Sequence, residues 1–218
     1  MISGEKRFQF YGRRKGKSLR RHHLSLMDGL LPQLRVQVGQ PFSGPCRARW
    51  LEIGFGGGEH LAHQAELHPD ICFIGAEPFI NGVAKLLALI EAKSLKNIQI
   101  HDGDARQLLA SLPDGCIDRI YLLYPDPWPK ARHNKRRFVS PETLAEISRV
   151  LTPGGMFLFA SDIADYVSWT RDHVAAHGGF VEVGDAARAF ENWIETRYEA
   201  KARREGRVSS YLTFRRID

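Results

Sequence analysis

The sequence predicts an α/β fold in which helices cover both faces of a mostly parallel sheet. From about residue 48 onward, short apolar runs alternate with segments of helical periodicity. Runs such as those at 71–76 and 156–160 are apolar throughout, as expected of strands that are buried on both faces. The first run leads through a cluster of glycines directly into a helical pattern, which begins a βα unit.

The first two βα units are predicted from apolar runs and helical spacing. A strand is predicted at residues 49–53, which stops at the glycines, and a helix at residues 58–67 follows them. A second strand is predicted at residues 71–76, where the run stops at an acidic residue. The next helix, at residues 80–93, repeats apolar side chains on one face at Val83, Leu86, Leu87 and Ile90.

The same alternation continues to the C-terminus. A short strand at residues 98–101 is followed by a helix at 105–112, and an apolar strand at 117–124 stops at a proline-rich loop. A helix at 141–151, a strand at 156–160 and a helix at 164–177 come next. Two late strands are predicted at 180–183 and 208–214, separated by a long charged stretch that can form a helix.

Charge is distributed unevenly along the chain. The 31 Lys and Arg residues outnumber the 25 Asp and Glu residues, for a net charge of +6. Residues 1–49 carry +9, residues 50–129 carry −6 and residues 130–218 carry +3. This distribution favours a polyanion bound by the two ends and a small, cationic ligand bound in the middle.

Composition excludes several classes of protein. No apolar stretch approaches the ~18 residues of a membrane span and no secretory signal is found, so a cytoplasmic protein without membrane contact is expected. The three cysteines, Cys46, Cys72 and Cys116, are never spaced as C-x-x-C. They are expected to be reduced and mostly buried, with neither a disulfide nor a zinc site.

The chain is expected to form one domain with an appendage. Residues 46–218 are predicted to be that domain, and residues 1–45 a basic, partly disordered N-terminal extension. The extension serves either as a grip for phosphates or only as a solubilising tail. We call this extension the head, and seven of its basic residues are called the head cations below: Arg7, Arg13, Arg14, Lys15, Lys17, Arg20 and Arg21.

The turn after the first strand has the character of a ligand-binding loop. It reads LEIGFGGG, with Gly54, Gly56 and Gly58 at alternate positions, so its backbone can approach a ligand closely. The spacing is not the G-x-G-x-x-G of dinucleotide-binding proteins. Glu52, just before the loop, repels a pyrophosphate and attracts a cation.

Two further acids follow the second and third strands. Glu77 lies 19 residues after Gly58, where Rossmann-like proteins place the carboxylate that binds ribose hydroxyls. Asp104 precedes a predicted helix and suits an N-cap as well as a ligand contact, and the two roles can coexist.

The loop after the fourth strand combines an acid, an aromatic ring and a basic run. The segment YPDPWPK stiffens this loop with three prolines around Asp126 and Trp128, which suits the binding of a planar base. The run from Lys130 to Arg137 contains five Lys or Arg residues and His133. Beside a binding loop, such a run suits contacts with phosphates. Although His60, His63 and His68 lie close in sequence, no metal site is expected.

These motifs together resemble one family. The block YPDPWPKARHNKRR, with LEIGFGGGEH, GAEPF, the Ser161 and Asp162 pair and the segment TRYE at 196–199, is similar to the bacterial tRNA (guanine-N7-)-methyltransferases. The resemblance implies a Rossmann-like class I methyltransferase fold, with a seven-stranded sheet whose last strand is antiparallel. It also implies S-adenosylmethionine as cofactor, no metal, and methylation of N7 of the guanosine at position 46 in the tRNA variable loop.

The resemblance also assigns roles to residues. Asp126 is implied to be catalytic, and the cofactor would be bound by Glu52, Gly54, Gly56, Gly58, Glu77, Asp104 and Asp126. The substrate would be bound by Lys130, Asp162, Thr196, Arg197, Tyr198 and Glu199. RNA contacts are expected from the rest of the basic run: Arg132, His133, Asn134, Lys135, Arg136 and Arg137.

Other functions stay open on the sequence alone. One is a methyltransferase of the same fold that acts on a nitrogen of another RNA or of a protein. A second is a non-catalytic RNA-binding protein or a nicotinamide enzyme, and the glycine spacing argues against NAD. No obligate protein partner is indicated, and a monomer and a homodimer are equally compatible with the sequence.

Overall fold

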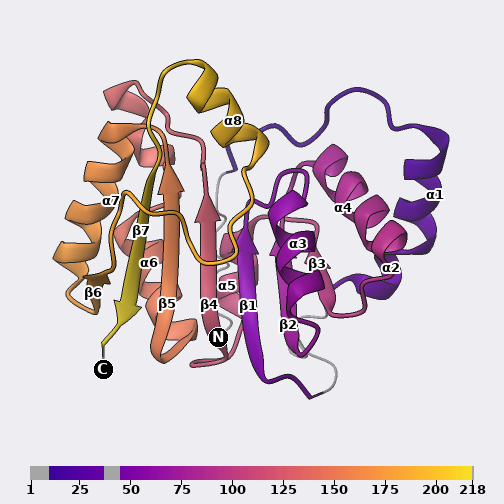
Figure 1. The fold of residues 1–218 in the computed structure, drawn as a ribbon, viewed down its shortest axis with the longest axis horizontal. Coiled ribbons are helices and arrows are strands. Elements are labelled where there is room, and N and C mark those ends of the chain that lie inside the picture. Colours follow the sequence, from indigo (N-terminus) through magenta and orange to yellow (C-terminus); the bar gives the residue numbers. More distant parts are fainter. Residues whose placement is uncertain (1–9, 37–44, 218) are drawn as a thin grey trace, which may run out of the picture.

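The computed structural model describes residues 10–36 and 45–217, and within them one seven-stranded sheet with the order β3-β2-β1-β4-β5-β7-β6 (Figure 1). The neighbours from β3 to β5 are parallel, and β7 runs antiparallel to both β5 and β6. The predicted fold class is thereby confirmed, with an antiparallel last strand. The strands are β1 (Ala48–Ile53), β2 (Ile71–Ala76), β3 (Ile98–His101), β4 (Ile117–Leu123), β5 (Leu151–Ser161), β6 (Phe180–Val183) and β7 (Ser210–Arg216).

Helices cover both faces of this sheet. The helices that pack against it are α3 (Glu59–Leu67), α4 (Ile80–Lys93), α5 (Ala105–Ser111), α6 (Pro141–Val150) and α7 (Ala164–His177). The long charged stretch contains α8 (Arg197–Arg204), and a 3-10 helix, η1 (Ala131–Arg136), lies in the loop after β4. In Figure 1, α8 lies beyond the C-terminal ends of the parallel strands, at the edge where sheets of this kind bind ligands.

Side chains of alternate strand residues enter two separate apolar layers. Leu51 and Ile53 of β1 pack with α5, α6 and α7, whereas Trp50 packs with α3 and α4. Because both layers exclude water, the strands need apolar residues on both faces, which explains their continuous apolar runs.

The head contains two helices that the sequence analysis did not predict, α1 (Arg21–Gly29) and α2 (Leu31–Leu34). They form because Leu26, Leu31 and Val36 enter the apolar core. After α2, the backbone of the head pairs with the sheet, where Val36 N–H donates to Ile100 O of β3 at 2.9 Å. Arg7 lies outside the described residues.

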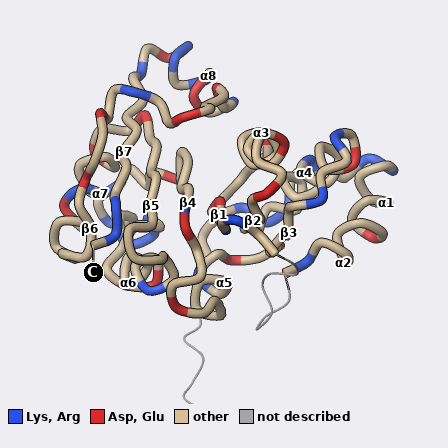
Figure 2. Tube along the Cα trace, turned by 60° about the horizontal axis from the view of Figure 1, so that its bottom comes forward, with Lys and Arg blue, Asp and Glu red and all other residues tan. Residues whose placement is uncertain are grey.

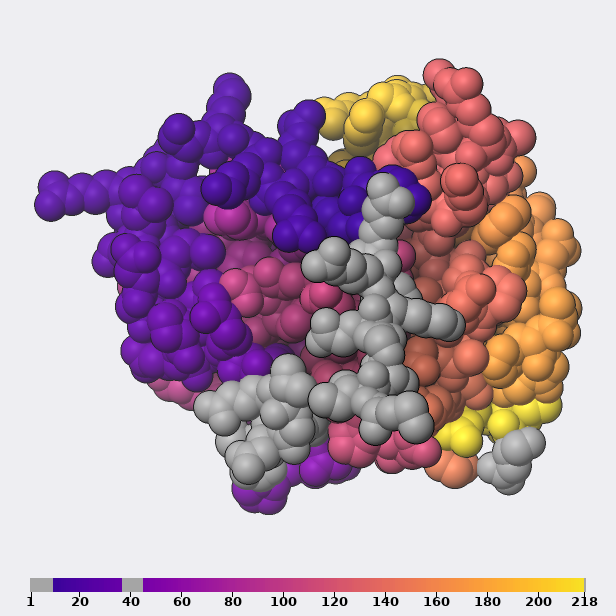
Figure 3. All heavy atoms as spheres, turned by 180° about the vertical axis from the view of Figure 1, so that it is seen from behind, coloured from indigo at the N-terminus to yellow at the C-terminus, as the bar shows by residue number. Residues whose placement is uncertain are grey.

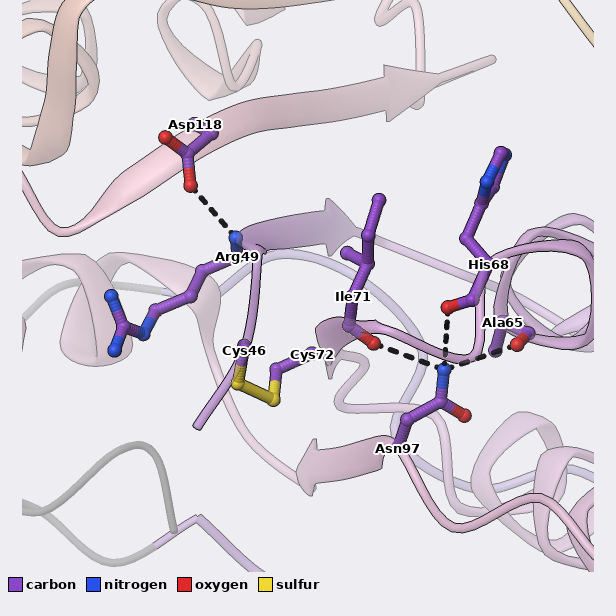
Figure 4. The surroundings of a disulfide bond; sticks show 8 residues. All are labelled: Cys46, Arg49, Ala65, His68, Ile71, Cys72, Asn97 and Asp118. Atoms are coloured by element: carbon purple, nitrogen blue, oxygen red, sulfur yellow. Dashed lines mark hydrogen bonds between the residues drawn. A yellow bond between two sulfur atoms is a disulfide. The ribbon is translucent and has the colours of Figure 1, made fainter. Parts of the chain in front are cut away.

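The expectation that all three cysteines are reduced is wrong for two of them. Cys46 and Cys72 form a disulfide, with their Cα atoms 5.7 Å apart (Figure 4). Cys116 is a free thiol. The pairing arises because β1 and β2 are parallel and in register, with Arg49 opposite Cys72. This brings Cys46, two positions before β1, beside Cys72 of β2, although the cysteines are 26 positions apart in sequence.

The disulfide gives a prediction about thiol chemistry. Protein purified without reductant and unfolded in an alkylating reagent is expected to show one reactive thiol, Cys116, and three after reduction. Because the bridge closes a loop of 26 residues, reduction is expected to lower the free energy of unfolding by about 3 kcal/mol. Mass spectrometry counts the thiols, and three reactive thiols before reduction would contradict the pairing.

Candidate active site

The glycine turn folds back against the start of α4. Gly54, Gly56 and Gly58 all have positive φ angles, of 71°, 58° and 78°. A Cβ on Gly82 of α4 would lie 2.0 Å from the carbonyl oxygen of Gly56, so only glycine allows this approach. The glycine turn therefore packs directly against the backbone of α4.

Glu77 holds the glycine turn from the end of β2. Its carboxylate is buried and accepts hydrogen bonds from Gly56 N–H and Phe79 N–H, both at 2.8 Å. Burial raises the pKa of Glu77, and the two backbone hydrogen bonds act in the opposite direction. The charge of Arg197 lowers this pKa and the charge of Asp126 raises it, so the three side chains lie in one region.

Glu52 is held by a histidine that sequence analysis did not assign to the site. The carboxylate Oε2 of Glu52 lies 2.7 Å from Nδ1 of His60, and both side chains are buried. Both residues line a pocket with Gly54 and Phe55 of the glycine turn, under Arg197 and Tyr198. The only signal in the sequence was the position of His60 in the first turn of the predicted helix.

Asp104 caps α5, as one of its two suggested roles requires. Its carboxylate accepts hydrogen bonds from the backbone N–H and the Nε of Arg106, both at 3.0 Å. The capping role is thus confirmed, and a ligand contact by the same carboxylate stays a prediction.

The loop after β4 has unusual backbone geometry around Asp126. Tyr124 and Trp128 have backbone φ angles of 49° and 42°, in a region that residues other than glycine rarely adopt. Such conformations persist only where neighbours enforce them, and they cluster at functional sites. The carboxylate of Asp126 reaches the surface, and partial desolvation by this loop raises its pKa.

Arg137 supports the loop from inside the fold, which corrects its expected role as an RNA contact. The residue is only 4% exposed, and its Nε donates to the carbonyl of Pro127 at 2.9 Å. Its guanidinium lies over the rings of Tyr166 and Trp169, and it also pairs with Asp165. A group enclosed in this way cannot reach a phosphate without unfolding the loop.

The burial of Arg137 gives a stability prediction. Arg137→Met is expected to lower the free energy of unfolding by about 2 kcal/mol, because it removes charged hydrogen bonds. The matched change Arg132→Met, at an exposed position of the same run, is expected to have almost no effect. Chemical denaturation measures both, and equal stability of the two variants would contradict the supporting role.

The remaining residues of the basic run form the rim of the site. Lys130, Arg132 and Lys135 are exposed, while His133, Asn134 and Arg136 are half-buried. Partial desolvation, together with the surrounding cations, lowers the pKa of His133.

The head reaches this rim. The guanidinium of Arg136 lies over the rings of Tyr11 and Trp128, at 4.7 and 4.9 Å. Farther along the head, Ile80 N–H at the start of α4 donates to Arg14 O at 3.0 Å. Figure 3 shows the indigo head lying beside the segment that follows β4. The exposed Arg13, Arg14, Lys15 and Lys17 therefore lie between two loops of the site.

The start of α8 closes the site from above. Thr196 caps this helix by accepting a hydrogen bond from Glu199 N–H at 3.2 Å. Glu199 in turn accepts from the indole of Trp193 at 2.7 Å and from the hydroxyl of Tyr211. Basic residues are frequent along α8 (Figure 2).

Arg197 and Asp162 complete the set of expected residues. A Cβ on Gly56 would lie 3.1 Å from Nη2 of Arg197, which places this guanidinium over the glycine turn. Asp162, after β5, pairs with Arg207 at 2.6 Å. Burial raises the pKa of Tyr124 to about 12, and the negative charges of Glu199 and Asp162 raise it in the same direction. The structure thus brings residues from the loops after β1, β2, β3, β4 and β5, and from the start of α8, to the C-terminal edge of the sheet.

The part of the chain that the structure describes contains neither a cluster of metal-ligating side chains nor a membrane-spanning helix. Residues 10–36 and 45–217 contain no group of three His, Cys, Asp or Glu side chains arranged to hold a metal ion. Within the same ranges, no helix combines the length and apolar character that a membrane span requires. Trp169 and Trp193 are partly buried and pack against the core.

Comparison with known proteins gives a consistent result. A family model described as "Putative methyltransferase" matches residues 47–211. A tRNA (guanine-N(7)-)-methyltransferase of Agrobacterium fabrum is 53% identical, with 94% of each chain covered. The protein of the same name from Rhizobium meliloti is 51% identical, over 95% of this chain and 94% of the relative.

Solved structures share the fold at lower sequence identity. The 16S rRNA methyltransferase KamB is 19% identical, with a TM-score of 0.60 over 88% of this chain and 94% of its own. The aminoglycoside resistance methyltransferase NpmB1 is also 19% identical, with a TM-score of 0.54 over 80% of this chain and 89% of its own. At this identity the likeness concerns the fold alone.

Proposed function

The chain belongs to the family of tRNA (guanine-N(7)-)-methyltransferases, and from this premise we propose that it methylates N7 of a guanosine in tRNA. The methyl donor in this proposal is S-adenosylmethionine, which leaves as S-adenosylhomocysteine. The guanosine is the one at position 46 of the variable loop, as the resemblance implies. The protein acts as a monomer or a homodimer in the cytoplasm.

One observation carries the proposal: a set of acids and a glycine turn share one edge of the sheet with a rim of exposed cations. Glu52 and Gly54 line the same pocket, and Glu77 binds the turn through Gly56. Lys130 and Arg132 stand at the surface a few residues after Asp126. A cationic cofactor suits the acids, and an RNA phosphate suits the cations.

The residues present fit S-adenosylmethionine. A glycine turn lets the backbone approach the cofactor. Glu77, which follows β2 and binds this turn, is proposed to accept hydrogen bonds from the ribose. Glu52, buried beside the turn, suits a cationic group, and Asp104 at the next strand end suits the base. When bound, the cofactor supplies an electrophilic methyl group on a sulfonium.

Asp126 is proposed to stabilise charge during the transfer. Guanine N7 carries a lone pair and no proton, so the reaction needs no general base. Positive charge develops on the purine as the methyl group arrives, and a fixed carboxylate next to it lowers the energy of that state. The stiff loop around Asp126, pinned by Arg137 at Pro127, keeps the carboxylate in place.

Substrate contacts are proposed for two parts of the edge. Lys130, Asp162 and the segment from Thr196 to Glu199 are proposed to contact the target nucleotide, as the family resemblance implies. Trp128, with its ring half-buried, is available to stack on that base. Phosphates would be held by the exposed cations of the basic run, with His133, Asn134 and Arg136 nearby.

The head cations are proposed to be a second grip for phosphates, and this can be tested without truncation. A truncation after His23 would remove part of α1, whereas Arg13→Gln, Lys15→Gln and Lys17→Gln change only exposed side chains. The triple variant is expected to bind tRNA more weakly, with a salt dependence shallower by about 0.7 to 0.9 for each phosphate that is no longer neutralised. Filter binding at several salt concentrations measures this, and an unchanged slope would indicate a solubilising tail.

Incorporation of label identifies the substrate class. The protein is incubated with methyl-labelled S-adenosylmethionine and separate tRNA, ribosomal RNA and protein fractions from cells that lack this modification. Label is expected in tRNA alone. Label in ribosomal RNA or protein would favour another methyltransferase of this fold, and no label in any fraction would favour a non-catalytic RNA-binding protein.

A further inference from the structure

A buried histidine next to Glu52 has no role in the proposed reaction so far. His60 is 3% exposed and lies in the first turn of α3, directly after the glycine turn. Its Nδ1 is 2.7 Å from Oε2 of Glu52, and among the described residues its Nε2 has no hydrogen-bond partner. A buried polar group that is left half-satisfied is costly and calls for a physical explanation.

The surroundings of His60 fix its orientation. Its ring packs against Tyr121 of β4, with ring centroids 4.9 Å apart, and against Trp193, at 5.2 Å. Trp193 is itself tied to α8 through its hydrogen bond to Glu199. The imidazole is thus clamped between the sheet and the segment that closes the site.

We infer that His60 is a positioning residue for Glu52 and thereby a determinant of cofactor affinity. Donation from Nδ1–H occupies one carboxylate oxygen and fixes the side-chain rotamer of Glu52 within the pocket. The second oxygen is then available for the cationic amino-acid end that the cofactor would place in this pocket. This inference rests on the proposed function, because it assumes that the pocket binds S-adenosylmethionine.

The role can be separated from general support of the fold by comparing two ligands. S-Adenosylhomocysteine has the amino-acid end that Glu52 would bind, whereas 5′-methylthioadenosine lacks it. Loss of the His60 donor is therefore expected to weaken only the first ligand. A defect in the folding of the pocket would weaken both.

The experiment is calorimetric titration of purified variants with both ligands. His60→Leu is expected to weaken S-adenosylhomocysteine about tenfold or more, since it removes a hydrogen bond to a charged group. His60→Asn, which keeps an N–H donor near the position of Nδ1, is expected to restore most of the affinity. His63→Leu, one turn further along α3, is the matched control and is expected to bind both ligands normally.

A double substitution tests whether His60 acts through Glu52. In a Glu52→Gln background, His60→Leu is expected to cause little further loss, because the carboxylate that it positions is gone. Unchanged affinity in His60→Leu, or equal losses for both ligands, would overturn the inference. Wild-type protein that binds S-adenosylhomocysteine but methylates no tRNA would overturn the proposed function alone. Wild-type protein that binds neither ligand would overturn both.

Discussion

Replacing Asp126 by Asn is expected to slow methyl transfer 100-fold or more, while the affinity for S-adenosylhomocysteine changes less than tenfold. Asn keeps the size of the side chain and removes the charge that would oppose the positive charge on the purine. Because this interaction is strongest in the transition state, its loss should appear in turnover and much less in binding.

Single-turnover kinetics and calorimetry with the same preparations measure the two effects. The pH dependence gives a further check, since desolvation raises the pKa of Asp126. Protonation removes the useful charge, so the rate is expected to fall as the pH drops through a value above the ordinary aspartate range. This fall should be absent in Asp126→Asn. Asp172→Asn, at an exposed position on α7, is the control. Unchanged turnover in Asp126→Asn would contradict the role.

Removing the charges of Lys130, Arg132 and Lys135 together is expected to have the second large effect. The triple Gln variant should bind tRNA at least tenfold more weakly near physiological salt, with a salt dependence shallower by about 2 to 3. All three side chains are exposed, so the fold and the affinity for S-adenosylhomocysteine should be preserved.

A control for this variant lies at the opposite edge of the sheet. Arg47 and Lys96 precede β1 and β3, away from the strand ends that form the site. Arg47→Gln with Lys96→Gln is expected to leave tRNA affinity nearly unchanged. If this pair weakened binding as much as the rim variant, net charge rather than the rim would explain the affinity.

Much of the fold was predictable because periodicity is a local property. The strands at 71–76 and 98–101 and the helices at 80–93 and 164–177 begin and end where the sequence analysis placed them. The two head helices were missed because they depend on Leu26, Leu31 and Val36 entering a core made by distant residues. A basic segment viewed alone gives no sign of that core.

The candidate site was predictable where its chemistry is carried by short motifs. Strand ends place Glu77 and Asp126 at one edge, and both are found there, where the charge of Asp126 contributes to the raised pKa of Glu77. The features that were missed depend on packing between segments far apart in sequence. The burial of Arg137 under Tyr166 and Trp169 requires α7, and the Cys46–Cys72 pair requires the register of β1 and β2.

The central claim is that this site methylates guanine N7 in the tRNA variable loop. Its most direct test is to incubate the protein with S-adenosylmethionine and an unmodified tRNA transcript, and then to cleave the RNA chemically at N7-methylguanosine. Cleavage at the single variable-loop guanosine is expected, with none in a transcript where that guanosine is replaced by adenosine. Methylated tRNA that is not cleaved there, or tRNA that carries no methyl group, would contradict the claim.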